Sequence, residues 1–188
     1  MKRYSAQELT SFLRALDDEI EDPLDVILIG GSAAALAYQA TRTTLDIDTW
    51  NAPFEALAEE IDRARRRSAL PVPVEHAGVA GAPSNFETRL ELLEVPGVSK
   101  LRLRVPEKHD LVLMKTIRGY EHDLETAREI HLKHGLDLEV LVERYLEEMS
   151  HVVGDRQTLD LKFLALVERL FGESALARAE RAVDRRGR

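Results

Sequence analysis

Residues 25–48 read DVILIGGSAAALAYQATRTTLDID, and this stretch decides the fold. Its apolar, β-branched start predicts a buried strand over residues 25–29, which ends at the pair Gly30-Gly31. The alanine-rich residues 32–40 predict a tightly packed helix that the chain enters directly from this glycine turn.

The end of the same stretch predicts a second strand, because polar and apolar residues alternate strictly over residues 43–50. Side chains repeat every two residues along a strand, so Asp46 and Asp48 are expected on one face. Two carboxylates on one face can bind magnesium while substrate phosphates fill the remaining positions. The start of the preceding helix offers N–H groups and its positive dipole end to a triphosphate, and Ser32 can add its hydroxyl.

A simpler interpretation exists for each feature taken alone. The glycines then form a tight turn, the serine caps a helix and the two aspartates lie on a solvated strand face. Aspartate is disfavoured in strands, however, so two in one short strand beside a glycine turn need a reason. The combination favours the functional interpretation.

Composition excludes several classes of protein. The chain has 188 residues, a net charge of -8, 44% hydrophobic residues and no cysteine. This predicts an ordinary globular protein without a disulfide, a thiolate zinc site or a cysteine nucleophile, and we expect it in a reducing cytoplasm. No apolar run approaches the roughly 20 residues of a membrane helix, so no membrane partner is expected. The acidic balance argues against a binder of duplex DNA.

The remaining elements follow from capping signals and periodicity. Ser5 and Glu8 form a capping box that predicts a first helix to about Glu21. The rest of the chain predicts a helix over residues 53–67, a strand over 72–79, a hairpin of 89–95 with 101–105, helices over 107–117, 124–134, 138–149 and 159–171, and a charged helix or frayed end after Gly172. Gly119 is expected to end the helix over residues 107–117.

This order predicts an α+β fold, a small mixed β-sheet in residues 1–106 followed by a C-terminal helical bundle in residues 107–188. The two parts are expected to pack as one compact unit. In the hairpin, closed around Gly97-Val98, we expect Glu91 opposite Arg104 and Leu92 opposite Leu103.

Two motifs carry a resemblance to a known family. The series GGS at residues 30–32, followed by RTTLDID at residues 42–48, resembles the nucleotidyltransferase superfamily, and within it the bacterial branch that includes AbiEii-like abortive-infection toxins. The series PEKHDLVLMK at residues 106–115, continued by Arg118 and by residues 123–125, is similar to the second signature of that branch.

The resemblance implies a polymerase-beta-like sheet and an enzyme that transfers a nucleoside monophosphate from a nucleoside triphosphate. The implied acceptor is a hydroxyl on RNA, such as a tRNA end, or on a protein, and a toxin role with a cognate antitoxin rests on the resemblance alone. The implied cofactor is a pair of Mg²⁺ ions at Asp46 and Asp48. The implied nucleotide-binding residues are Gly30, Gly31, Ser32, Arg42 and Thr44.

Lys115 and a third carboxylate complete the expected site. Burying Lys115 among apolar residues is costly without an anionic partner, which favours a catalytic role at phosphate, although a lysine can also extend to solvent. For the third carboxylate we prefer Glu75 over Glu91, because Glu91 is expected to pair with Arg104. Asp123 is either a late acidic residue of the site, or it has a structural role as a helix cap or an ion-pair partner. Without a third carboxylate the centre would be weakened or degenerate.

Two other functions stay open at this point. One is a catalytically inactive nucleotidyltransferase-like module that binds nucleotide or a partner protein. The other is transfer to a small molecule of the aminoglycoside type, which an acidic surface would attract. Three groups of basic residues could bind RNA, although such groups are more often solvated surface. These groups are residues 65–67, the arginines after Gly172, and Lys100 with Arg102 and Arg104.

Overall fold

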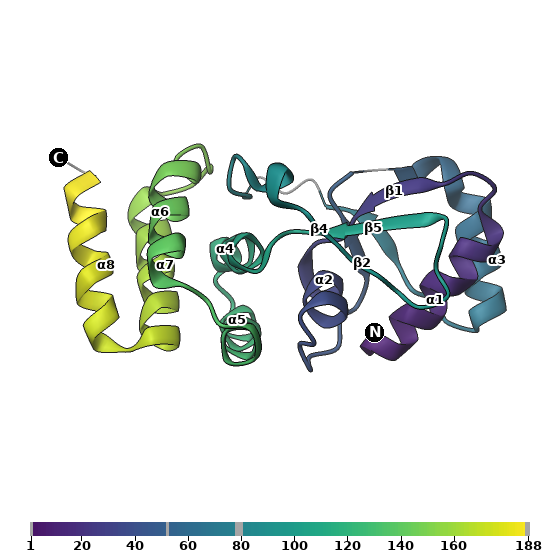
Figure 1. Cartoon of the computed structure of the whole chain (residues 1–188), viewed down its shortest axis with the longest axis horizontal. Coiled ribbons are helices and arrows are strands. Elements are labelled where there is room, and N and C mark those ends of the chain that lie inside the picture. Colours follow the sequence, from purple (N-terminus) through teal and green to yellow (C-terminus); the bar gives the residue numbers. More distant parts are fainter. Residues whose placement is uncertain (1, 52, 78–80, 187–188) are drawn as a thin grey trace. The chain divides into compact units, whose positions relative to one another are not determined.

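The computed structural model describes residues 2–51, 53–77 and 81–186. These residues form two compact units, which we call the sheet unit and the helical unit (Figure 1). Among the described residues, the sheet unit holds residues 2–51, 53–77 and 90–106. The helical unit holds residues 81–89 and 107–186. The boundaries expected from the sequence, and the packing of both parts as one unit, stay predictions.

The sheet unit alternates helices with short strands. It contains α1 (Ala6–Glu19), β1 (Leu24–Ile27), α2 (Gly30–Ala37), β2 (Ile47–Thr49), the 3₁₀ turn η1 (Pro53–Leu57), α3 (Ala58–Ser68), β3 (Val74–His76), β4 (Glu91–Leu92) and β5 (Leu101–Val105).

The expected capping box starts α1. The Ser5 hydroxyl accepts from the Glu8 backbone N–H at 3.3 Å, and Glu8 Oε2 accepts from the Ser5 N–H at 2.9 Å. The apolar face of α1 contributes Leu9, Phe12 and Leu13, all fully buried, to the core of the unit. Helix α1 packs along α3, so these two helices form one layer of the sheet unit.

The strands form a small mixed arrangement, which confirms the predicted fold class. β5 lies between β1, to which it is parallel, and β4, to which it is antiparallel. β2 and β3 form a separate parallel pair. An isolated antiparallel bridge between Leu28 and Thr49 joins the end of β1 to β2, and the Ile29 N–H donates to the Asp48 carbonyl at 3.0 Å.

The strand predicted over residues 43–50 is too long, because β2 covers only Ile47–Thr49. Thr44, inside the predicted strand, pairs instead with Tyr4 in an isolated antiparallel bridge. The backbone therefore leaves the strand direction between Thr44 and Ile47. The strand predicted over residues 72–79 forms only at β3, and its residues 78–79 lie outside the described residues.

The predicted hairpin register is wrong by one residue. Glu91 lies opposite Val105 and Leu92 opposite Arg104. The cause is distant in sequence, since the buried Asp17 carboxylate accepts from the backbone N–H groups of residues 99, 100 and 101, at 3.0, 2.7 and 2.6 Å. These bonds fix where β5 begins. The Leu93 N–H still donates to the Leu103 carbonyl at 2.9 Å, and the Val98 N–H donates to the Val95 carbonyl at 3.0 Å in the turn between the strands.

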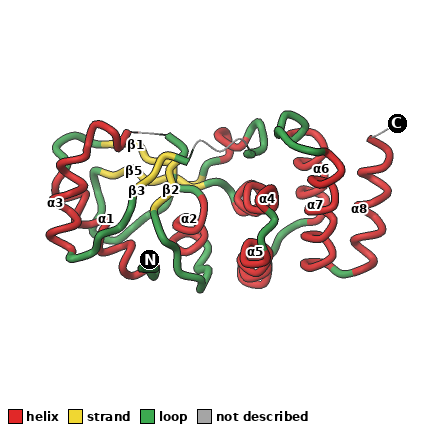
Figure 2. The backbone as a smooth tube through the Cα atoms, turned by 180° about the vertical axis from the view of Figure 1, so that it is seen from behind, coloured by secondary structure: helices red, strands yellow, loops and turns green. Residues whose placement is uncertain are grey.

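The helical unit contains five α-helices among its described residues (Figure 2). Gly119 ends the first of them in the left-handed conformation, as predicted, and the charged tail forms a regular last helix that pairs with the one before it. The elements are the 3₁₀ turn η2 (Phe86–Arg89), α4 (Lys108–Arg118), α5 (Glu121–His134), α6 (Leu138–Glu148), α7 (Arg156–Phe171) and α8 (Glu173–Arg186).

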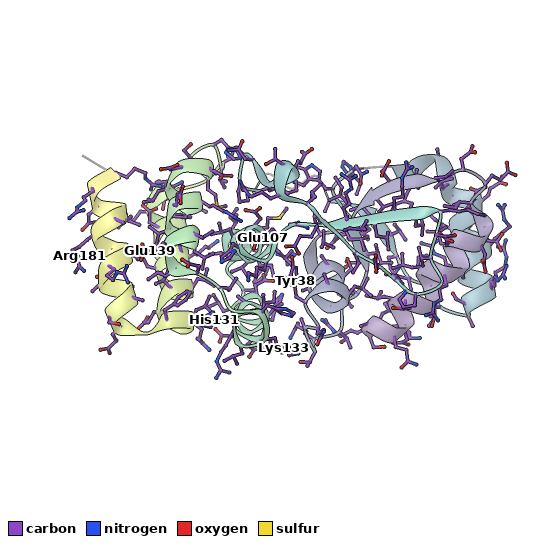
Figure 3. The ribbon with its side chains drawn as sticks, viewed as in Figure 1. Tyr38, Glu107, His131, Lys133, Glu139 and Arg181 are labelled. Carbon is purple, nitrogen blue, oxygen red and sulfur yellow. The ribbon has the colours of Figure 1, made fainter. Side chains whose placement is uncertain are left out.

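A buried ionic network ties residues 81–89 to the helical unit. Arg89 donates two parallel hydrogen bonds to the fully buried Asp110, at 2.9 and 3.0 Å, and two more to Glu148, at 3.0 and 2.7 Å. Arg144 donates to Asp110 and to Glu107, the residue that caps the start of α4 (Figure 3). Burial raises the pKa of Glu107, but the bonds from His109 and Arg144 outweigh it and hold this pKa at about 2.

Candidate active site

Three carboxylates meet where β2 lies beside β3. Asp48 and Glu75 are direct partners in the parallel register, and Asp46 precedes Asp48 by two residues. Each offers an oxygen atom that lies within 4.8 Å of those of the other two. Asp46 and Asp48 are half-buried and Glu75 is exposed. The structure thus brings the preferred third carboxylate, Glu75, to the two aspartates that the motif singled out.

The glycine turn lies directly against this cluster. Gly30 has a φ of +65°, and a Cβ added there would clash with the Asp48 carboxylate. A Cβ added at Gly31 would lie 2.9 Å from Thr44 Cβ. Because L side chains avoid positive φ and no room is left beside Asp48, Gly30 is required for this approach of α2 to β2, and Gly31 is required for the close contact with Thr44.

Helix α2 begins at this turn. The first N–H groups of a helix have no partner within it, so those of α2 are available for an anion near the carboxylates. The Ser32 hydroxyl is fully buried and donates to the Ile29 carbonyl at 2.9 Å. Ser32 therefore closes the turn with its side chain, whereas Arg42, in the connection after α2, is exposed.

The donor set fits a hard divalent cation. Carboxylate oxygens are the ligands that Mg²⁺ prefers, and three like charges this close repel one another until a cation compensates them. Asp46, Asp48 and Glu75 would hold the ion, and phosphate oxygens and water would complete its coordination. Within the ranges that the structure describes, no second group of three potential ligands of this kind occurs.

Glu91 does not join the carboxylate cluster. Its Oε2 lies 3.1 Å from the hydroxyl of Tyr38, the residue at the end of α2, and that hydroxyl also lies 2.7 Å from the Pro106 carbonyl. Figure 3 labels Tyr38. The expected pairing of Glu91 with Arg104 is wrong, because the register places Val105 opposite Glu91.

Lys115 and Asp123 belong to the helical unit. Lys115 is 4% exposed and its Nζ lies 3.4 Å from Asp123 Oδ1, which also accepts from Arg118 at 3.0 Å. The anionic partner that burial of Lys115 requires is thus present within the same unit. A role for Lys115 at phosphate, and one for Asp123 in the site, stay predictions.

Sequence reasoning missed two residues that shape the site. Tyr4 forms the backbone bridge with Thr44, and no local pattern indicates this pairing. The Asn51 side chain accepts from the Ile27 N–H and donates to the Asp25 carbonyl, both at 2.7 Å. It thus bonds backbone groups of β1 as a neighbouring strand would. An asparagine directly after a strand was the available signal for Asn51.

The comparison with known families agrees with this geometry. The model of the family described as "Nucleotidyltransferase of unknown function (DUF6036)" matches residues 7–169. The chain belongs to the DUF6036 family. The match spans parts of both units and confirms the nucleotidyltransferase superfamily, but it does not extend to the AbiEii-like branch.

Membership of DUF6036 supports transfer of nucleotidyl groups at a general level and names no substrate or acceptor. No curated protein and no solved structure matches this chain. None of the helices in the described ranges is both long enough and apolar enough to cross a membrane.

Proposed function

We propose that this chain catalyses magnesium-dependent transfer of a nucleoside monophosphate from a nucleoside triphosphate to an acceptor hydroxyl. The observation that carries the proposal is the meeting of Asp46, Asp48 and Glu75 against the Gly30-Gly31 turn at the start of α2. Membership of a nucleotidyltransferase family supports the class of reaction. The third carboxylate supports an active centre over a degenerate, merely binding module.

In the proposed reaction an acceptor oxygen attacks the α-phosphorus, the bond from that phosphorus to the bridging oxygen breaks, and pyrophosphate leaves. Magnesium, when bound, would offset negative charge on the attacking and leaving oxygens. The three carboxylates hold and orient the cation. The N–H groups of Gly30 and Gly31 contact the triphosphate, and Arg42 supplies positive charge from the exposed connection that leads to Asp46.

The proposed acceptor is a hydroxyl of RNA, with a protein hydroxyl as the alternative. Most of the basic residues considered for RNA have internal partners, which weakens their assignment as a binding face. Arg65 pairs with Asp62, Arg67 with Asp18 and Arg102 with Asp25. The arginine at position 66 and Arg104 remain exposed. A toxin role and an antitoxin partner stay predictions of the resemblance.

The experiment incubates the protein with each α-labelled nucleoside triphosphate, Mg²⁺ and total RNA. Label in RNA supports the proposal with RNA as acceptor, and label in protein supports it with a protein acceptor. Asp46→Asn should abolish transfer while the fold is retained, because removing a metal ligand costs the metal-free fold little. Asp22→Asn, the same chemical change at an exposed position before β1, should retain full activity.

The same assay separates the alternatives. Binding of nucleotide without any transfer would favour the inactive module and contradict the proposal. Label on an added aminoglycoside, with none in RNA or protein, would favour the small-molecule acceptor. Full transfer by Asp46→Asn would overturn the assignment of the carboxylate cluster.

A further inference from the structure

Thr44 is a buried residue in contact with both halves of the candidate site. It is 7% exposed, and its Oγ1 donates to Asp46 Oδ1 at 3.2 Å. The same side chain occupies the space beside Gly31, where an added Cβ would lie 2.5 Å from Oγ1. Thr44 thus lies between the glycine turn and a carboxylate expected to bind metal.

The backbone of Thr44 is held in turn by Tyr4. The Tyr4 N–H donates to the Thr44 carbonyl at 2.7 Å, and the Thr44 N–H donates to the Tyr4 carbonyl at 3.0 Å. Tyr4 is 2% exposed, and its hydroxyl donates to the Pro71 carbonyl at 2.7 Å. Tyr4 therefore connects the segment before β2 with the segment before β3, the two strands that carry the carboxylates.

The neighbouring residues reinforce this connection. Arg3 Nε donates to Thr43 Oγ1 at 3.0 Å, and the Arg3 guanidinium also bonds the Thr43 carbonyl. Beyond Thr44, the Ile47 N–H donates to the Pro73 carbonyl at 2.8 Å, where the pairing of β2 with β3 begins. The backbone on both sides of Asp46 is thus fixed, and the Thr44 hydroxyl restrains its side chain.

We propose that Thr44 is a positioning residue whose hydroxyl orients the Asp46 carboxylate toward a bound cation. The inference rests on the proposed function, because it concerns the same three carboxylates. A hydrogen bond to one oxygen limits rotation of the carboxylate, and such outer-shell bonds are worth about 10-fold to 100-fold in metal affinity. Thr44 acts through Asp46 in this role, from a buried position.

The alternative is that Thr44 only fills space beside Gly31. The two roles depend on different groups of the side chain. The hydroxyl bonds Asp46, whereas the methyl group only fills space. Thr44→Ser and Thr44→Ala both remove the methyl group and differ only in the hydroxyl. Thr44→Val keeps the shape of threonine and removes only the hydroxyl.

The test measures Mn²⁺ binding without nucleotide, from the electron paramagnetic resonance signal of free Mn²⁺, together with the melting temperature of each metal-free variant. We expect Thr44→Ala to bind Mn²⁺ about 10-fold more weakly than Thr44→Ser, and Thr44→Ser to stay within about twofold of wild type. Thr44→Val should bind as weakly as Thr44→Ala although its packing is retained.

Equal Mn²⁺ affinity in folded Thr44→Ala and Thr44→Ser would overturn the positioning role. Asp48→Asn, which removes an expected ligand, separates this failure from failure of the proposed function. If Asp48→Asn loses Mn²⁺ binding while Thr44→Ala and Thr44→Ser bind Mn²⁺ equally well, the assignment of the metal site stands and the positioning role of Thr44 is refuted. Equally weak binding by wild type and Asp48→Asn refutes the metal site, and the positioning role with it.

Discussion

Asp48 on β2 lies directly opposite Glu75 on the parallel strand β3. Paired residues in neighbouring strands place their side chains on the same face of a sheet, so this register alone brings together two carboxylates that are 27 residues apart in the sequence. Asp46 joins them from the residue just before β2. The cluster therefore depends on a non-local strand pairing and on one short motif.

Removing Mg²⁺ should lower the melting temperature of the wild-type protein. At a concentration ten times the dissociation constant, Mg²⁺ should add about 1.4 kcal/mol to the free energy of unfolding, or about 3 °C. Glu75→Gln should reduce this gain, and should melt slightly higher than wild type in chelator because one like charge is gone. Differential scanning calorimetry with Mg²⁺ and with chelator measures both effects, and Glu94→Gln, at another exposed carboxylate, should behave as wild type.

Gly30→Ala should damage the site more than the fold. The positive φ alone costs about 1 kcal/mol with an alanine side chain, and the added Cβ would also displace the Asp48 carboxylate. We expect Mn²⁺ binding to weaken by about 10-fold or more. Gly135→Ala is the matched control, since Gly135 has a φ of +63° with nothing within 4 Å of an added Cβ. A Gly30→Ala protein with wild-type Mn²⁺ affinity would contradict the described approach of α2 to Asp48.

Asp17 should make stability depend on pH. Burial raises its pKa, but backbone N–H bonds from Leu101, Ser99 and Lys100 outweigh burial and hold the pKa below its usual 3.8. A carboxylate with a lowered folded-state pKa stabilises the protein above its unfolded-state pKa, and this stabilisation is lost as the pH falls through the folded-state pKa.

Urea unfolding at a series of pH values tests this prediction. Asp17→Asn should lose about 2 kcal/mol of unfolding free energy at pH 7, because an amide cannot replace a carboxylate that accepts three N–H bonds. The difference between the variant and wild type should shrink below about pH 4. A difference that stays constant down to pH 2 would show that the charge of Asp17 contributes nothing.

Arg89→Ala should destabilise the helical unit by about 3 kcal/mol, because it takes one of two arginine partners, Arg89 and Arg144, away from the fully buried Asp110. Arg169→Ala removes an arginine that pairs with the exposed Glu121 on the surface, and should cost less than about 1 kcal/mol. Chemical denaturation of both variants gives the comparison, and similar losses in the two would refute the importance of burial.

The sequence predicted the elements better than their pairing. Capping by Ser5 and the stop at Gly119 depend on residues within one or two turns, and both are confirmed. The predicted register of β4 with β5 was wrong because Asp17, far away in the sequence, fixes the start of β5. A contact between residues so far apart cannot be predicted from local sequence patterns.

The candidate site shows the same division. Asp46 and Asp48 were apparent from a motif, whereas the sequence favoured Glu75 over Glu91 through a Glu91–Arg104 pair that does not form. The pairing of β2 with β3 is what brings Glu75 to the two aspartates. The sequence also could not show that the hydroxyls of Ser32 and Thr44 are engaged inside the protein, because their partners are a carbonyl and a carboxylate placed by the fold.

Residues 81–89 also determine how the protein can be divided. Arg89 and the buried Phe86 belong to the helical unit, although the residues that follow, 90–106, belong to the sheet unit. A truncated protein ending at residue 106 would keep this segment without Asp110 and Glu148, and would expose an aromatic side chain beside an uncompensated guanidinium. Expression of the sheet unit alone therefore calls for replacing the segment with a short polar linker.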